Sequence, residues 1–177
     1  MASVNGANRS GALILGLFLF LAAAVCAVAP LPLVLRSAGV LLFSYISFAV
    51  AGSQVALLTA LLAPVLGLLS GSEDWLVMLP IILASNLLGM LGLEFSWRYA
   101  AVVVSPALVA APLLTSVVLS RQELFMVDLP WGDGATAWLL LHVLVALFGV
   151  LAALLLDRRQ RLRQERGRTA RDGAEAA

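Results

Sequence analysis

Long apolar runs, separated by short polar interruptions, make up most of the chain between residues 10 and 156. The stretches without a charged residue are 10–35, 37–72, 75–93, 99–120 and 134–156. A helix needs about 20 apolar residues to cross the hydrocarbon core of a bilayer, and every stretch reaches about that length. The runs lack the alternation of a barrel strand. The pattern therefore predicts an all-α membrane protein that crosses the bilayer several times.

The stretch 37–72 determines the number of crossings. As one helix it would measure about 54 Å at 1.5 Å per residue, which is too long for a single span. Gly52-Ser53-Gln54 interrupts it and so predicts two short helices. The result is a bundle of six short transmembrane helices in one domain over 1–157, followed by an Arg-rich tail over 158–177. The predicted spans are about 11–29, 38–51, 55–70, 75–93, 99–119 and 136–157.

The arginines indicate how the bundle is oriented. With the N- and C-termini both cytoplasmic, nine arginines lie inside and two outside, which is the bias expected of a membrane protein. A five-span arrangement gives almost the same bias and moves only the N-terminus outside. The chain has no lysine, which is typical of GC-rich bacterial coding. We therefore expect a multi-pass protein of the bacterial cytoplasmic (inner) membrane.

Three connecting segments follow from these spans. Pro30 and Pro32 are expected to end the first helix, so that 30–37 forms an outer loop. Residues 94–98 form an inner loop. The outer loop 121–133 is unusually apolar for a connector, which suits either a lid over an outward pocket or a half-buried interfacial segment. The tail is expected to continue the last helix as far as about Gly167 and to bind the anionic leaflet through its arginines.

The first span contains two pairs of small residues, Ala12 with Gly16 and Ala23 with Ala27, and the members of each pair are about one helical turn apart. Such spacing lets two helix backbones approach closely. It fits packing inside the bundle, and it also fits an interface with another membrane subunit. Both interpretations stay open at this stage.

Polar residues inside the spans are the next candidates for a site. Asn86 lies near the middle of 75–93, and His142 lies in the outer half of 136–157. An unpaired polar group in hydrocarbon is costly, so each must face protein or a cavity. They form either interhelical hydrogen bonds or part of an outward solute pocket. The full set of candidate ligand-binding residues is Asn86, His142, Trp138, Arg36, Glu123 and Trp131.

Several kinds of chemistry have no motif in this sequence. It contains no phosphate-binding Walker loop, no Gly-x-Ser-x-Gly and no His-Glu-x-x-His. His142 is the lone histidine and Cys26 the lone cysteine, which argues against a metal site built on them. The basic tail comes without a nucleic-acid-binding fold. We expect a protein that is not an enzyme, carries no cofactor and binds no nucleic acid.

Three segments carry a resemblance to a known family. They are Ala23-x-x-x-Ala27, the run 54–64 (QVALLTALLAP) and the run 79–89 (LPIILASNLLG). With six short spans, the chain resembles the substrate-binding S-component of energy-coupling factor (ECF) vitamin transporters. The resemblance implies a small-metabolite or vitamin importer with an outward pocket capped by loops. It also implies partners, namely a transmembrane coupling subunit gripped through small residues and two ATPase subunits.

Two other functions are consistent with the same pattern. One is a membrane scaffold in a cell-shape or envelope complex, similar in size and span count to rod-shape morphogenesis proteins of the MreD type. The chain lacks the acidic, Gly-rich pattern expected of that family, which ranks this interpretation second. The other is a small integral membrane protein with neither role.

Overall fold

The computed structural model describes residues 6–99, 102–121, 129–130 and 134–175, and over these residues the chain is helical with short turns. No strand occurs among them. Six α-helices and one short 3-10 helix follow one another along the described chain. They are α1 (Gly6–Val28), α2 (Leu33–Ala51), α3 (Ser53–Leu66), η1 (Gly67–Ser70), α4 (Glu73–Tyr99), α5 (Val104–Arg121) and α6 (Ala135–Glu175).

The predicted all-helical fold with membrane-length apolar segments is confirmed. Five segments are long and apolar enough to cross a bilayer, namely Gly11–Val28, Leu33–Ala51, Ser53–Ser70, Glu73–Ser96 and Ala135–Leu156. The sixth apolar helix, Val104–Ser120, is shorter and lies at the lower limit of spanning length. The predicted break at Gly52 is also present. Gly52 has a φ of 95°, a conformation that glycine adopts without strain, and it joins α2 directly to α3.

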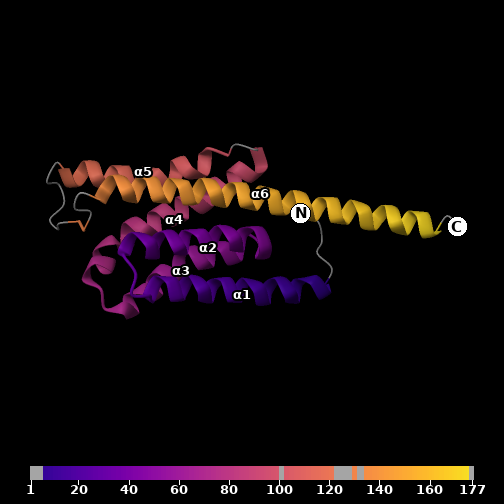
Figure 1. The fold of residues 1–177 in the computed structure, drawn as a ribbon, viewed down its shortest axis with the longest axis horizontal. Helices are drawn as coiled ribbons and strands as arrows, with labels where there is room; N and C mark the ends of the chain where they lie inside the picture. Colours follow the sequence, from indigo (N-terminus) through magenta and orange to yellow (C-terminus); the bar gives the residue numbers. More distant parts are fainter. Residues whose placement is uncertain (1–5, 100–101, 122–128, 131–133, 176–177) are drawn as a thin grey trace.

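The helices lie side by side in one elongated bundle (Figure 1). α2 lies at its centre, because it contacts α1, α3, α4 and α6. We call one end of the bundle the η1 end; there α1 ends, α2, α4 and α6 begin, and α5 ends. The opposite end, the Gly52 end, contains the α2–α3 junction and the start of α1. α6 extends well beyond the bundle at the Gly52 end (Figure 1).

Three predicted boundaries are wrong. The outer loop expected over 30–37 is much shorter, because α2 begins at Leu33 directly after Pro32. Proline suits this place, since its φ is already helical and the first turn needs no N–H donor. The inner loop expected over 94–98 is helical, because α4 continues to Tyr99. The tail helix does not end near Gly167, because α6 continues to Glu175. Most of the predicted outer loop 121–133 lies outside the described residues.

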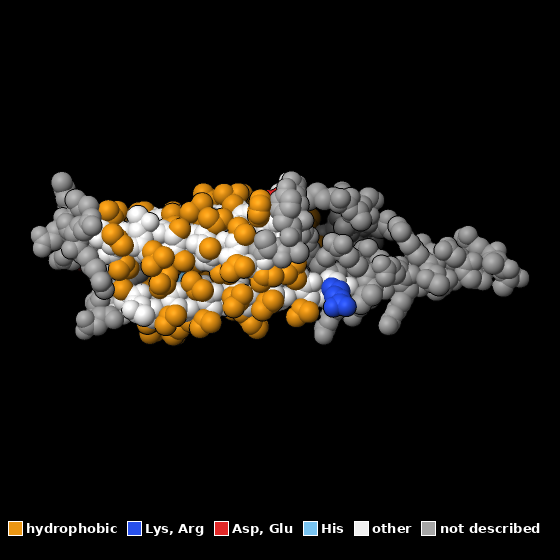
Figure 2. All heavy atoms as spheres, turned by 90° about the horizontal axis from the view of Figure 1, so that it is seen from above, with side chains coloured by type: hydrophobic (Ala, Val, Ile, Leu, Met, Phe, Trp, Pro, Cys, Tyr) orange, Lys and Arg blue, Asp and Glu red, His pale blue; other side chains and the backbone are white. Residues whose placement is uncertain are grey.

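The exterior of the bundle is apolar. Many large hydrophobic side chains are exposed along its length, for example Phe18, Leu69, Leu76, Phe148 and Leu155. On the face that Figure 2 shows, hydrophobic side chains form a broad belt, and a basic side chain appears where the belt ends. A soluble protein rarely exposes apolar patches of this extent. The belt is the surface expected of a multi-pass membrane protein.

Tyr45 holds the middle of the bundle together. Its ring is fully buried, and its hydroxyl is hydrogen-bonded to Ser105 Oγ of α5. Ser105 Oγ in turn lies 2.7 Å from the carbonyl oxygen of Gly89 in α4. Gly149 of α6 makes room for the ring, because a Cβ atom there would lie only 2.6 Å from Tyr45 Cγ. One side chain of α2 thus packs against three other helices.

We expect Gly149→Ala to destabilise the bundle by about 1–3 kcal/mol, because the added methyl group overpacks the buried Tyr45 ring. The measurement is the free energy of unfolding in a detergent titration. Gly11→Ala is the matched control, since a Cβ atom at Gly11 meets nothing within 4 Å. Equal effects of the two substitutions would contradict the close approach of α6 to Tyr45.

Candidate functional site

Arg36 occupies the interior of the η1 end. Its side chain is only 5% exposed, although the sequence pattern placed it in an outer loop. Arg36 Nε donates to the carbonyl oxygen of Ala27 at 2.8 Å, and Nη2 donates to the same oxygen. Nη2 also donates to Ser70 Oγ at 2.8 Å and lies 3.4 Å from the carbonyl oxygen of Gly67. One guanidinium group therefore links α2 to α1 and to η1.

The charge of Arg36 is stabilised without a carboxylate partner among the residues that the structure describes. Ala27 lies in the last turn of α1, and Gly67 is the C-terminal cap of α3. The C-terminal end of a helix carries unpaired carbonyl groups and a partial negative charge. The guanidinium group thus lies where two helix C-termini meet. This arrangement explains how a membrane bundle tolerates a buried cation.

Trp75 of α4 completes this cluster. The guanidinium carbon of Arg36 lies 4.3 Å from the centroid of the Trp75 ring, within the range of a cation–π contact. Trp75 Nε1 donates to the carbonyl oxygen of Pro64 at 2.8 Å. Gly67 permits this packing, because a Cβ atom there would lie 2.4 Å from the indole ring. The Trp75 side chain is fully buried.

His142 and Trp138 form a second polar cluster at the same end. The two rings are stacked, with centroids 5.3 Å apart and an interplanar angle of 3°. His142 Nδ1 lies 2.8 Å from the carbonyl oxygen of Trp138, so this nitrogen carries the hydrogen. His142 Nε2, 3.0 Å from Ser37 Oγ, is then the acceptor of the serine hydroxyl. Since Ser37 follows Arg36 in α2, the two clusters lie on adjacent positions of one helix.

Asn86 lies apart from both clusters, at the α3–α4 interface. Its Nδ2 donates to the carbonyl oxygen of Ala60 at 3.1 Å. Ala60 is four residues before Pro64, and proline has no N–H to close the usual helical hydrogen bond to that carbonyl. Asn86 therefore supplies the donor that Pro64 lacks. Of the two roles predicted for Asn86, the described contact is thus an interhelical hydrogen bond, which satisfies a carbonyl group that Pro64 leaves open.

The remaining predicted site residues have different outcomes. Glu123 and Trp131 lie outside the described residues, so their place in a site stays a prediction. Gly16, Ala23 and Ala27 are buried against the protein's own helices. A Cβ atom on Gly16, for example, would lie 2.9 Å from Ala51 and Val55.

These three positions of α1 therefore pack inside the bundle rather than forming an open face for a partner. The predicted interface residue Ala12 is half-buried. The exposed face of α1 carries large side chains instead, including Leu13, Leu17 and Phe18.

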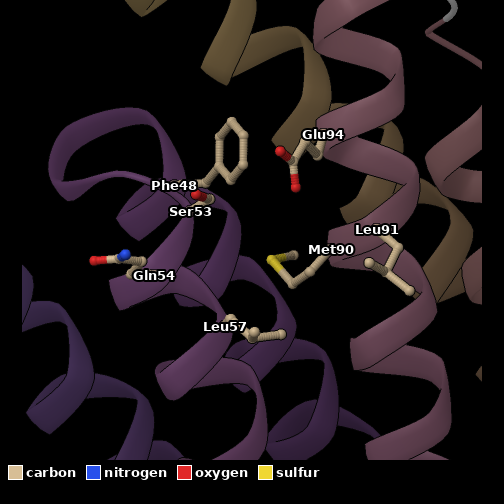
Figure 3. A pocket seen from close by; sticks show the side chains of 7 residues that line it. All are labelled: Phe48, Ser53, Gln54, Leu57, Met90, Leu91 and Glu94. Carbon is tan, nitrogen blue, oxygen red and sulfur yellow. The ribbon is translucent and has the colours of Figure 1, made fainter. Parts of the chain in front are cut away.

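Two pockets are described, and neither is lined by Arg36, Asn86, Trp138 or His142. The first, of about 120 Å³, lies at the Gly52 end and is lined by Phe48, Ser53, Gln54, Leu57, Met90, Leu91 and Glu94. In Figure 3 the side chain of Gln54 points away from Glu94, so these two polar groups do not converge. The second is an open apolar hollow between α4 and α5.

The Ser37–His142 pair has the spacing of a nucleophile and a general base. Both side chains are buried, however, and Ser37 Oγ also lies 3.1–3.2 Å from the carbonyl oxygens of Leu33 and Val34 in its own helix. Neither described pocket reaches the pair. The described geometry is that of a polar cluster that joins α2 to α6.

Sequence reasoning missed Ser37, Ser70 and Trp75 as members of these clusters. The glycine at position 67 was the one feature of the sequence that pointed to Trp75, because a residue without a side chain leaves room for a bulky ring. Comparisons of the chain with models of protein families, with curated proteins and with solved structures gave no match.

We expect Arg36→Lys to destabilise the protein by about 1–3 kcal/mol, because a lysine keeps the charge but cannot reproduce the forked hydrogen bonds to buried acceptors. Arg158→Lys is the matched control, since Arg158 is exposed. Thermal unfolding in detergent is the measurement. An unchanged melting temperature for Arg36→Lys would show that the hydrogen bonds of the guanidinium group are not needed for stability.

We also expect the effects of Asn86 and Pro64 to be coupled. Asn86→Leu should cost about 1–2 kcal/mol in the natural chain, because the carbonyl group of Ala60 loses its donor. In a Pro64→Ala background the same change should cost much less, since the new alanine supplies a backbone N–H to that carbonyl. A double-mutant cycle of unfolding free energies measures the coupling, and additive effects would contradict it.

Proposed function

We propose that this protein is a non-enzymatic subunit of the bacterial inner membrane that binds a small solute, as a substrate-binding subunit of a multi-component ECF-type importer does. In this proposal both termini lie in the cytoplasm and the η1 end faces outward. The bias of arginine toward the other side supports this orientation. The solute is delivered to partner subunits that supply energy, because the sequence contains no Walker loop for ATP hydrolysis.

The observation that carries the proposal is the gathering of Ser37, Trp138 and His142 at the η1 end, one residue along α2 from Arg36. A solute site in a membrane protein combines an apolar wall with a few polar groups that fix its orientation. Here an imidazole, a serine hydroxyl and an indole lie together. A solute enters by replacing the Ser37–His142 hydrogen bond with bonds of its own, so binding opens α6 slightly from α2.

A second function, the membrane scaffold, is favoured by a different observation. Only 17% of the residues in the α1 span are buried inside the bundle, the lowest share among the five membrane-length segments. Its exposed leucine and phenylalanine side chains offer a large surface to another membrane protein. In this case the polar clusters at the η1 end serve only to keep the bundle rigid.

The two functions are distinguished by mass spectrometry of what is retained after purification in mild detergent. For a binding subunit we expect one small metabolite in stoichiometric amount, lost in His142→Leu because the imidazole no longer contributes a polar contact. Asn86→Leu is the control and should retain the metabolite, since Asn86 lies in another interface. Absence of any metabolite from the natural protein, together with a co-purified membrane protein, would favour the scaffold instead.

A further inference from the structure

The outer surface of α6 carries a regular row of exposed apolar residues. Leu144, Phe148, Leu151 and Leu155 follow one another at intervals of three or four residues, and each is between 44% and 64% exposed. In a helix this spacing places them on one side. A second row is buried and faces the bundle, and its members are His142, Ala146, Val150 and Ala153. α6 therefore has one lipid-facing and one bundle-facing row within the membrane.

Both rows continue past Leu156 because α6 remains a single helix to Glu175. Continuing the lipid-facing row by three or four residues from Leu155 reaches Arg158, Arg159, Leu162 and Arg166. The positions opposite this row are Asp157, Gln160 and Gln164, and Arg161 and Arg163 lie on the flanks between the two rows. The two arginines nearest the membrane are thus both on the lipid-facing side, and the positions opposite them carry no basic residue.

We propose that this basic row, Arg158, Arg159 and Arg166, is a binding site for the phosphate groups of anionic phospholipids. The reason is continuity: the residues directly before it lie against acyl chains, and the headgroup layer is what comes next along the helix. That layer is about 5–8 Å thick on each side of a bilayer. At 1.5 Å per residue, Arg158 and Arg159 begin within it, and Arg166 lies about 12 Å further along than Arg158.

The chemistry of the row also favours phosphate. Guanidinium groups bind phosphate oxygens in a bidentate manner. The Cα–Cβ bonds of a helix tilt toward its N-terminus, which for this extension is the direction of the membrane. This tilt shortens the distance between an arginine further along the row and the headgroup layer. The exposed position of Arg158 is consistent with this surface. The proposal does not depend on whether the protein binds a solute.

The test moves arginines from one side of α6 to the other without changing the net charge of the protein. The fourfold variant Arg159→Gln, Gln160→Arg, Gln164→Arg and Arg166→Gln keeps the net charge but transfers two arginines from the lipid-facing to the bundle-facing row. One of them moves about 3 Å nearer to the membrane and the other about 1.5 Å further from it. A simple attraction between a basic tail and the leaflet therefore predicts equal or stronger lipid binding. A one-sided phosphate site predicts weaker binding.

The measurement is the association of spin-labelled phosphatidylglycerol, relative to spin-labelled phosphatidylcholine, with the full-length protein reconstituted in phosphatidylcholine vesicles. For the natural chain we expect a several-fold preference for phosphatidylglycerol that weakens at high salt. For the fourfold variant we expect the preference to fall to near equality. Elution on size-exclusion chromatography verifies that the variant remains folded.

A control that removes arginines elsewhere on the extension distinguishes the effect of where the arginines lie from the effect of how many there are. Arg161, Arg168 and Arg171 lie off the basic row, and their replacement by glutamine should leave most of the preference in place. Three outcomes would overturn the proposal. They are no preference in the natural chain, full preference in the fourfold variant, and equal loss in the fourfold variant and the control. If the extension instead binds an acidic protein, the preference for phosphatidylglycerol should be the same in the natural chain and in the fourfold variant.

Discussion

The absence of water from the hydrocarbon core is the constraint that shapes this bundle. A polar group that enters it needs a partner within the protein, because an unpaired one costs several kcal/mol. The described structure meets this need largely by pairing side chains with backbone carbonyls. Arg36, Ser85, Asn86 and Ser105 each donate to a carbonyl oxygen on another helix. Among the described buried side chains, only the hydroxyl groups of Ser47 and Ser96 have no partner. Interhelical polar contacts thus act together with the buried apolar cluster in fixing how the helices meet.

Two of these contacts, those of Arg36 and Asn86, serve carbonyl groups that the helices themselves leave without a usual donor. One such place is the helix C-terminus, whose carbonyls lack helical partners: Arg36 donates to that of Ala27 and lies 3.4 Å from that of Gly67, which also accepts from Ser70 Oγ. The other is proline within a helix, and Asn86 serves the carbonyl left open by Pro64. Glycines make room for the large aromatic side chains that pack between the helices: Gly67 lies against Trp75, and Gly149 lies against Tyr45. The polar, proline and glycine positions therefore depend on one another across α2, α3, α4 and α6.

The helical fold could be predicted because hydrophobicity and length act locally. The break at Gly52 was also predictable, since glycine and two polar residues interrupt an overlong apolar run. The partners of Arg36, Asn86 and His142 could not be predicted in the same way. They depend on which faces of distant helices meet, and apolar spans carry no periodic pattern to reveal those faces. The first helix ends before Pro30 as predicted, but the loop after it was predicted too long, because proline starts a helix as readily as it ends one.

The sequence distance between Arg36 and Trp75 has a consequence for biosynthesis. Along the chain, Ala27 precedes Arg36 and emerges from the ribosome before it, but Gly67, Ser70 and Trp75 follow Arg36 and emerge later. An arginine at the centre of a span is unfavourable by about 2.5–3.5 kcal/mol during insertion, and the cost is smaller for Arg36 because it lies in the first turn of α2. Its partners at the end of α3 and the start of α4 arrive later. We therefore expect the environment of Arg36 to be complete only once α3 and the start of α4 have joined α1 and α2.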